Sequence, residues 1–375
     1  MLRTDFTERD ILSKRKQLLN EIMKEVPAGV GKPGITKLQK DILLEILQSG
    51  SKWALKNGYG YKEDIDRTEE YGCMKSADPQ VVSDKALSRG MPQLGTLGAG
   101  NHFLEIQKVD KIYDVEIAKK FGIEKEGQIT VSIHCGSRGL GHQVASDYIA
   151  KMESKYGFKD LPDRELINAP INSELGQQYY KAMCCGVNYA FANRQMIEHW
   201  VRDVFNKLMG TSDGMSQIYD VCHNIAKMEK HKVDNEIKTV CVHRKGATRS
   251  FGPGRDEIPE IYRSIGQPVI IPGSMGTASY LLVGTKEAEE VSFASTAHGA
   301  GRVSSRAAML RSIRGEDVKR KLEGKNIEVI SNSMKGLAEE SPEAYKDIDE
   351  VVKTSHQVGL GKMVVRLVPL GVMKG

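Results

Sequence analysis

The spacing of apolar positions predicts three helical segments. Between residues 8 and 26 apolar side chains recur every three or four positions, and Pro27 closes the stretch. A second helical stretch covers residues 36–48, and the longest covers residues 173–209. In this longest segment, large apolar side chains lie on or near one helix face: Tyr180, Met183, Val187, Phe191, Met196, Trp200 and Phe205.

Residues 128–134 alternate and are rich in β-branched side chains, which is typical of a strand with His134 at its C-terminal end. Residues 237–243, 268–272 and 363–370 predict further strands. Helices and strands follow one another without the regular rhythm of βαβ units. We therefore expect an α+β fold, a single catalytic domain over residues 1–375 with mixed sheets surrounded by helices, rather than a doubly wound sheet.

Composition adds few constraints. The 375 residues can bury a large core, and 27% charged with 40% hydrophobic residues is ordinary for a globular protein. The net charge of +5 arises from 54 basic and 49 acidic residues, an excess compatible with a polyanionic partner but also with a merely soluble surface. The six cysteines form no CxxC pair, which argues against a disulfide framework or a structural zinc knuckle. Without a long apolar run or a signal peptide, we expect a cytoplasmic protein with no membrane partner.

Four histidines lie in short segments rich in glycine or asparagine. They are His102 in GTLGAGNHFLE (95–105), His134 in IHCGSRGLGH (133–142), His223 in DVCHN (220–224) and His298 in STAHGAGRVSSR (295–306). Glycine lets the backbone approach a ligand closely, and imidazole binds transition metals or attacks phosphorus. The repeated pairing predicts an active site that handles metal and phosphate.

The glycine loops do not match the common nucleotide-binding motifs. The segment GTLGAG lacks the strand–turn–helix context of the dinucleotide fingerprint. Each Gly-Lys pair is followed by Pro33, Asn326 or Met363, which excludes a P-loop. A nucleotide would therefore be held in another way, and a single glycine loop is more commonly a turn.

The histidines differ in the chemistry that their neighbours favour. Three of them, His102, His134 and His223, make a nitrogen-rich partial ligand set for Mn²⁺, Zn²⁺ or Fe²⁺, although no HExxH pair supports it. Small residues flank His298, which suits a nucleophile, and a structural turn is the alternative. Basic residues near the glycine-rich turns favour a path for an RNA or nucleotide backbone: Arg138, Arg244, Lys245, Arg249, Arg255, Arg302 and Arg306. We expect structural or surface roles for His142, His199, His231, His243 and His356.

Taken together, the segments closely resemble the RtcB family of RNA-splicing ligases, over essentially the whole chain and in order. The matching stretches are PQLGTLGAGNHFLE (92–105), HCGSRGLGHQVASDY (134–148), YDVCHN (219–224), VHRKGATR (242–249), VIIPGSMGTASY (269–280), STAHGAGRVSSR (295–306), AYKDID (344–349) and GVMKG (371–375). The combination of GNHF, HxGSRGxGH, PGSMG and HGAGR is far more specific than any single motif.

The resemblance implies an enzyme that joins an RNA 3′-phosphate or 2′,3′-cyclic phosphate end to a 5′-hydroxyl end, as in tRNA splicing or RNA repair, using GTP and Mn²⁺. It implies that His298 is the nucleophile that takes GMP, and that His102, His134 and His223 are metal ligands. Archease is an implied partner, beside RNA and GTP.

The resemblance also implies two sets of binding residues. The guanine-nucleotide contacts are Asn101, His102, Phe103, Leu104, Glu105, His223, Asn224, Pro272, Gly273, Ser274, Met275, Ser279, His298, Gly299, Ala300, Gly301 and Lys374. The basic positions that suit RNA or phosphate are Arg89, Arg138, Lys245, Arg302 and Arg306.

One feature departs from the family pattern. Family members carry an N-terminal segment with an Asp-x-x-Cys-Gly motif whose aspartate and cysteine bind metal, and these 375 residues contain no such motif. We therefore expect an N-terminally truncated fold in which one metal site keeps only His134 and His223 and the other only His102. A truncated gene model, a split gene and a genuinely shortened protein would each account for it. Substitution by Cys135 or Cys222 is disfavoured, because neighbouring strand residues point to opposite faces.

Two other functional hypotheses stay open beside the ligase. One is a non-catalytic RNA- or nucleotide-binding remnant, or a fragment of a split ligase, with an incomplete metal site. The other is a metal-dependent phosphoesterase on the same scaffold.

Overall fold

The computed structural model describes residues 1–34, 38–158, 161–210 and 214–375. The larger helices are α2 (Arg15–Glu25), α3 (Lys40–Ser49), α7 (Arg138–Tyr156), α8 (Glu174–Met209), α12 (Gly315–Gly324) and α14 (Ile348–Gln357). The shorter ones are α1 (Glu8–Ile11), α4 (Ser51–Lys56), α5 (Asp84–Gly90), α6 (Val115–Lys120), α9 (Glu260–Arg263), α10 (Lys286–Ser292), α11 (Arg306–Ser312) and α13 (Met334–Glu339). The 3₁₀ helices are η1 (Lys62–Arg67), η2 (Glu69–Gly72), η3 (Pro79–Val81), η4 (Met91–Gln93), η5 (Arg164–Leu166) and η6 (Pro342–Ala344).

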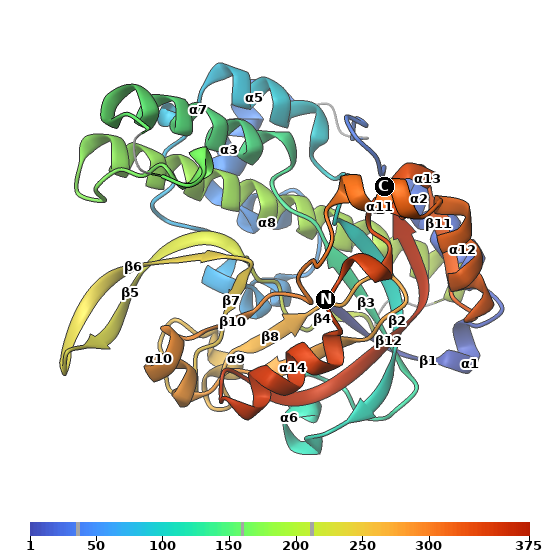
Figure 1. Ribbon diagram of the computed structural model, residues 1–375. Helices are drawn as coiled ribbons and strands as arrows, with labels where there is room; N and C mark the ends of the chain where they lie inside the picture. The colour runs from blue at the N-terminus through green and yellow to red at the C-terminus, as the bar shows by residue number, and fades with distance from the viewer. Residues whose placement is uncertain (35–37, 159–160, 211–213) are drawn as a thin grey trace.

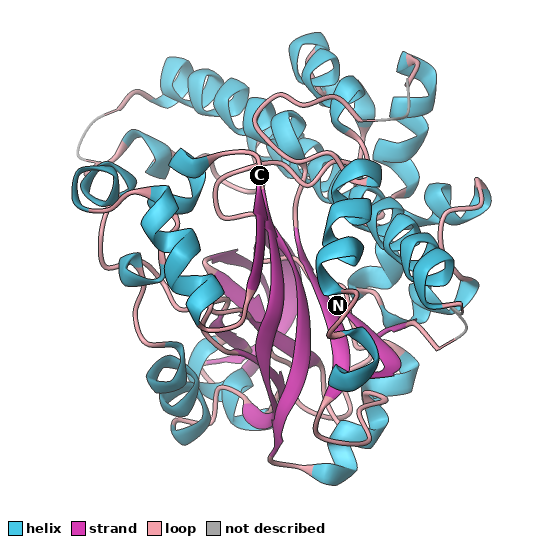
Figure 2. Ribbon diagram, turned by 90° about the vertical axis from the view of Figure 1, so that its right-hand side faces the viewer, coloured by secondary structure: helices cyan, strands magenta, loops and turns pink. Residues whose placement is uncertain are grey.

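The main sheet has eight strands within the described ranges. In space the path runs β4 (Ser216–Gln217), β1 (Leu2–Thr7), β3 (Gln128–His134), β2 (Phe103–Ile112), β12 (Lys362–Lys374), β9 (Ser279–Val283) and β8 (Pro268–Ile271). Strand β11 (Glu328–Ser331) pairs with β12 in parallel, and the other pairings are antiparallel. Figure 2 shows these strands as one twisted sheet enclosed by helices. This arrangement confirms the α+β expectation.

In the part of the chain that the structure describes, two smaller two-stranded sheets lie outside the main sheet. One pairs β7 (Ala247–Arg249) with β10 (Ser295–Ala297), and the other is the hairpin of β5 (Asn224–Val233) and β6 (Glu236–Lys245). Asp234 and Asn235 form the two-residue turn with φ angles of 52° and 65°, the left-handed pair that a type I′ hairpin turn needs. Figure 1 shows this long hairpin extending away from the body.

Helix α8 organises the helical layer. Its N-terminus is capped by Ser173, whose hydroxyl accepts a hydrogen bond from the Gly176 N–H, and it ends at Gly210 in the left-handed conformation. One stretch of the helix packs with α3, α4 and α7 in one hydrophobic core, and its C-terminal part packs with α2 and the central sheet in a second core. Figure 1 places α3, α5, α7 and α8 together on one side of the sheet.

Several sequence predictions hold with changed boundaries. The strand over residues 128–134 is β3, and the longest helix is α8. The strand predicted over 363–370 continues to Lys374, and the second helix begins at Lys40; residues 36 and 37 of that prediction lie outside the described residues. The single helix predicted over residues 8–26 is wrong, because a turn divides it into α1 and α2.

Candidate functional site

Strand register brings three predicted site residues side by side at one end of the main sheet. Lys374 on β12 is the partner of Phe103 on β2, and Phe103 is the partner of His134 on β3. The Phe103 and His134 rings meet edge to face with centroids 5.2 Å apart. The Lys374 ammonium lies 5.8 Å from the centre of the Phe103 ring. Distant parts of the sequence therefore meet in one row across three strands.

The four histidines form a chain of neighbouring rings. Ring centroids are 6.0 Å apart between His102 and His134, and 5.1 Å apart between His134 and His223. His223 and His298 stack with centroids at 4.8 Å and an interplanar angle of 24°. The structure thus gathers the four histidines from four segments. The other five histidines are not part of this chain among the described residues; His231, for example, is buried against Glu229.

Burial keeps these four imidazoles neutral near pH 7. It lowers the pKa of His134 well below its usual value, and together with His298 and Arg194 it lowers the pKa of His223 to about 3. Burial and the nearby Arg138 lower the pKa of His102 to about 4. Burial also lowers the pKa of His298, against an opposing hydrogen bond with the Gly246 backbone. A neutral ring keeps the nitrogen lone pair that metal binding or nucleophilic attack needs.

His102 is fixed by its loop. Its Nδ1 lies 2.9 Å from the Leu97 carbonyl oxygen and 3.3 Å from a guanidinium nitrogen of Arg138. Arg138 starts helix α7 with a φ of 51° and also donates to the Thr96 hydroxyl. Gly98 has a φ of +91°, and a Cβ built there would lie 1.8 Å from the Arg138 guanidinium. Glycine is required at this position because arginine occupies the space of a side chain.

The residues fit a metal ion in part. The Nδ1 of His134 is buried without a hydrogen-bond partner among the described residues. The His134–His223 separation matches the roughly 5 Å expected when two imidazoles share one ion with nitrogen bonds of about 2.1 Å. In the described part of the chain, no group of three or more histidine, cysteine, aspartate or glutamate side chains is arranged to hold a metal. The predicted ligand roles of His102, His134 and His223 stay predictions.

The two neighbouring thiols are not prepared as ligands. All six cysteines fall within the described ranges and are free. Burial raises the pKa of the Cys135 thiol, and it raises that of Cys222 to about 12. Both sulfur atoms are engaged by the protein, Cys135 with the Thr96 and Leu97 carbonyls and Cys222 with Arg194. A buried protonated thiol is a poor metal ligand.

A cavity opens beside the histidine chain. Its lining includes His134, His223, His298, Arg194 and Asp220. Arg194 donates to Asp220 over 2.6 Å and to the Cys135 carbonyl over 3.0 Å. Sequence reasoning gave Arg194 no role, although an arginine within the apolar stretch of the long helix was a signal of a buried ionic partner.

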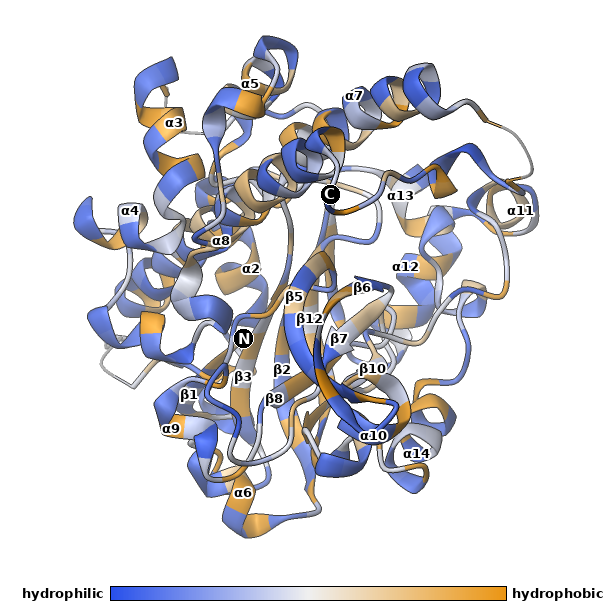
Figure 3. Cartoon of the chain, turned by 90° about the vertical axis from the view of Figure 1, so that its left-hand side faces the viewer, coloured by the Kyte–Doolittle hydropathy of each residue, from blue (hydrophilic) through white to orange (hydrophobic). Residues whose placement is uncertain are grey.

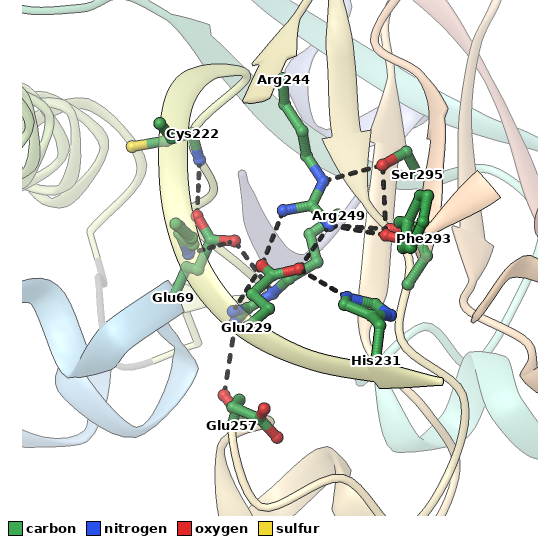
Figure 4. Close-up of polar contacts among 12 residues, drawn as sticks. Glu69, Cys222, Glu229, His231, Arg244, Arg249, Glu257, Phe293 and Ser295 are labelled. Atoms are coloured by element: carbon green, nitrogen blue, oxygen red, sulfur yellow. Dashed lines mark hydrogen bonds and ion pairs between the residues drawn. The ribbon is translucent and has the colours of Figure 1, made fainter. Parts of the chain in front are cut away.

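A buried ionic cluster holds the segment that carries His223. Glu69 accepts the N–H of Cys222 over 3.0 Å, directly before His223. Glu69 is fully buried and contacts Lys227 at 2.9 Å and Arg249 at 3.4 Å. Figure 4 shows Glu69 and Arg249 together with Glu229 and His231 of β5. The cluster fixes the backbone of β5 against η2.

The same cluster reaches the segment before His298. The Arg244 guanidinium binds Glu229 through two nitrogens, at 2.7 and 2.8 Å, and donates to the Ser295 hydroxyl and the Phe293 carbonyl. Strand pairing then sets Ala297 opposite Ala247. The expectation that Arg244 and Arg249 line an RNA path is therefore wrong, since both are buried and paired with glutamates. Periodicity could not distinguish these arginines from exposed ones.

The other predicted basic residues differ in their freedom. The buried Glu340 binds both Arg302 at 3.2 Å and Arg306 at 2.7 Å. Arg302 also donates to the Glu339 and Ser304 carbonyls, whereas the Arg306 side chain is half exposed. Arg89 donates to Gln143. Lys245 is exposed and adjoins Gly246, which contacts His298. Of these residues, Lys245 is therefore best placed to contact an external phosphate, and Arg306 is the next best placed.

The predicted nucleotide contacts include several buried side chains. Leu104 and Met275 belong to hydrophobic cores, so a nucleotide contact at either residue would use backbone atoms. The Ser279 hydroxyl accepts from Gln107 and from the Gly273 N–H. Burial raises the pKa of Glu105 to about 8 and lowers that of Lys374 to about 8. All the nucleotide contacts of this set stay predictions, among them Asn101, Asn224, Pro272, Ser274, Gly299, Ala300 and Gly301.

The comparison with known families decides the affiliation. The family model described as "tRNA-splicing ligase RtcB" matches residues 1–375. The chain belongs to the RtcB family. This confirms the resemblance that the motifs carried, and RtcB proteins are RNA ligases by their family name.

Relatives of the RtcB family match the chain over its whole length. A tRNA-splicing ligase RtcB of Archaeoglobus fulgidus is 55% identical, with 100% of this chain and 79% of the relative covered. The Methanococcus maripaludis relative of the same name is 53% identical, with 100% and 79% covered. The Pyrococcus abyssi relative is 52% identical, with 100% of this chain but 41% of the relative covered. None of the described helices has the length and apolar character that crossing a membrane requires.

Proposed function

We propose that this chain is a GTP- and Mn²⁺-dependent RNA ligase that joins 3′-phosphate or 2′,3′-cyclic phosphate ends to 5′-hydroxyl ends in tRNA splicing or RNA repair. The observation that carries the proposal is His298, a neutral imidazole stacked on His223 at the end of a row of three further histidines. RNA and GTP are the proposed substrates, archease the proposed partner protein and the cytoplasm the proposed location.

In the proposed first step His298 acts as nucleophile. The backbone of Gly246 holds one ring nitrogen, which orients the imidazole and leaves the other nitrogen to attack the α-phosphorus of GTP. A nitrogen–phosphorus bond forms, the bond to the bridging oxygen breaks, and pyrophosphate leaves. Exposed Lys245 is close enough to His298 to lower its pKa, so it is placed to attract the phosphates.

In the later steps GMP moves to RNA. An oxygen of the RNA 3′-phosphate displaces His298 from phosphorus, which returns the neutral imidazole. The 5′-hydroxyl then attacks the activated 3′-phosphate and gives its proton to water, and GMP leaves with the bonding electron pair. A cyclic end is first opened by water to the 3′-phosphate.

The histidine row supplies the neighbouring donor atoms. His134 and His223, with His102 beyond them, are the residues that would hold Mn²⁺. When bound, the metal would neutralise the charge that develops on the phosphoryl oxygens. Glu69 contributes by fixing the backbone next to His223. Arg138 contributes by fixing the His102 ring.

The test is covalent labelling of this chain with GTP carrying a label on the α-phosphate, in the presence of Mn²⁺, followed by peptide mapping. Acid-labile GMP on the peptide that contains His298 supports the proposal, because a phosphoramidate is cleaved by acid. Labelling elsewhere, or equal labelling of a His298→Ala variant, contradicts it.

A further inference from the structure

The β5–β6 hairpin has two faces with different charge. Residues opposite one another in an antiparallel pair share a face. We name as the outer face of the hairpin the set Asn224, Ala226, Met228, Lys230, Lys232, Ile237, Thr239, Cys241, His243 and Lys245. The inner face consists of Ile225, Lys227, Glu229, His231, Val233, Glu236, Lys238, Val240, Val242 and Arg244.

Each cation of the inner face is neutralised. Lys227 pairs with Glu69 and Glu70, Lys238 pairs with Asp234 and Glu236, and Arg244 pairs with Glu229. This face is therefore used for attachment to the body of the protein, through the buried ionic cluster shown in Figure 4.

The outer face lacks such compensation. Its ten positions include Lys230, Lys232 and Lys245 and no acidic residue. All three lysines are exposed, and within the described ranges no carboxylate lies at salt-bridge distance from any of them. Figure 3 shows β5 mostly in the hydrophilic colours. Unpaired cations without intervening acids favour a polyanion.

Apolar side chains are interleaved with these lysines. Met228 is 45% exposed and Ile237 is 70% exposed, and the exposed His243 stands between Lys245 and the tip. Flat or flexible side chains between cations allow bases to pack while phosphates meet charge, which is how single strands are bound without sequence preference.

Along β6 the outer face is exposed or half-buried from Ile237 to Lys245 and so reaches the candidate site, whereas Ala226 on β5 is buried. Lys245 adjoins Gly246, whose Cα, given a side chain, would place that Cβ 3.4 Å from the His298 ring. From there ten residue pairs lead outward over roughly 30 Å, at about 3.3 Å per residue. We propose that the outer face of the hairpin binds the single-stranded RNA that extends from the reacting end. This inference rests on the proposed function, because it takes RNA as the substrate.

The test measures RNA affinity separately from catalysis. A long single-stranded RNA with a 3′-phosphate and an RNA of a few nucleotides are titrated, without GTP, against the chain and its Lys230→Gln/Lys232→Gln variant at several salt concentrations. Since each phosphate contact of a single strand contributes about 0.7 to the slope of log K against log salt, the variant should lose about 1.4 from the slope for the long RNA. Binding of the short RNA should not change.

Two matched variants control for charge and for the hairpin itself. Lys119→Gln/Lys120→Gln on α6 removes the same charge from another exposed surface, and Lys238→Gln removes an inner-face lysine of the same hairpin. Both should bind the long RNA as the unmodified chain does. An unchanged slope in the outer-face variant, or an equal loss of slope in the α6 variant, overturns the inference. An unchanged slope would leave an acidic protein as the alternative partner of the outer face.

The labelling of His298 distinguishes this inference from the proposed function. If the outer-face variant loses long-RNA affinity while no GMP is attached to the unmodified chain, the ligase mechanism fails and the RNA surface stands. If GMP attachment occurs and the affinities are unchanged, the reverse holds. Melting curves of each variant verify that the hairpin substitutions leave the fold intact.

Discussion

The imidazole rings of His223 and His298 stack with their centroids 4.8 Å apart, although the two residues lie 75 positions apart in the sequence. Two sets of contacts hold these rings together. The N–H before His223 is held by Glu69, and the strand before His298 is held by Arg244 and by pairing with β7. The candidate nucleophile is therefore positioned through the buried ionic cluster and the β7–β10 pair.

Replacement of His298 by alanine should abolish covalent GMP attachment. Small residues flank His298 and leave its ring nitrogen accessible, and none of the other three histidines of the row has the same small neighbours. His356→Ala is the matched control, because this histidine is exposed on α14. Labelled GTP with Mn²⁺ and gel detection of the protein-bound label measure the effect. Undiminished label in the His298 variant would assign the nucleophile elsewhere.

Replacement of Arg202 by methionine should destabilise the fold strongly. Arg202 is 2% exposed and binds Asp64 and Glu198 at 2.7 Å each. Its loss leaves two buried carboxyl groups without their cation, which costs about 3–5 kcal/mol. The exposed pair of Lys40 and Asp84 is the control, and Lys40→Ala should cost less than about 1 kcal/mol. Urea unfolding midpoints give both values, and equal losses would contradict the argument.

The ionic cluster should lose stability in acid. Burial raises the pKa of Glu70, but Lys227 and Arg249 outweigh it and bring the pKa from 4.5 down to about 2. A folded-state pKa below the unfolded value contributes stability that is present above pH 4.5 and is lost as pH falls toward 2. The stability difference between the unmodified chain and Glu70→Gln should therefore shrink over this range. A stability difference that stays constant with pH would show that the charge of Glu70 does not stabilise the fold.

Sequence patterns predicted those elements that have one apolar face and one polar face. Strand β3 alternates and α8 carries a long apolar stripe, so both were found. Strand β2 was missed because its first five residues are all buried, including the polar Glu105 and Gln107, which removes the alternation. Side chains that are buried through ion pairs, such as Arg244 and Arg249, look the same in sequence as exposed ones.

Gly98→Ala should disturb the His102 loop. The new methyl group would collide with the Arg138 guanidinium, and the backbone has a φ of +91°. Gly254→Ala is the matched control, because its φ is +97° and its Cβ would meet nothing within 4 Å. Both should lose about 1–3 kcal/mol through backbone strain, but only the Gly98 variant should also lose GMP attachment. Thermal melting and labelling separate the two effects. Equal labelling of both variants would show that the contact of Arg138 with His102 is not needed for GMP attachment.

Strand β12 has a consequence for how the protein is made. It pairs with β2 on one side and with β9 and β11 on the other, so it is an interior strand of the main sheet. During synthesis the earlier strands emerge from the ribosome long before β12, and their edges stay unpaired until β12 is available. A ribosome must therefore release residues 362–374 before the two halves of the sheet can combine and before Lys374 can reach Phe103. Until then, the unpaired strand edges expose the nascent chain to aggregation.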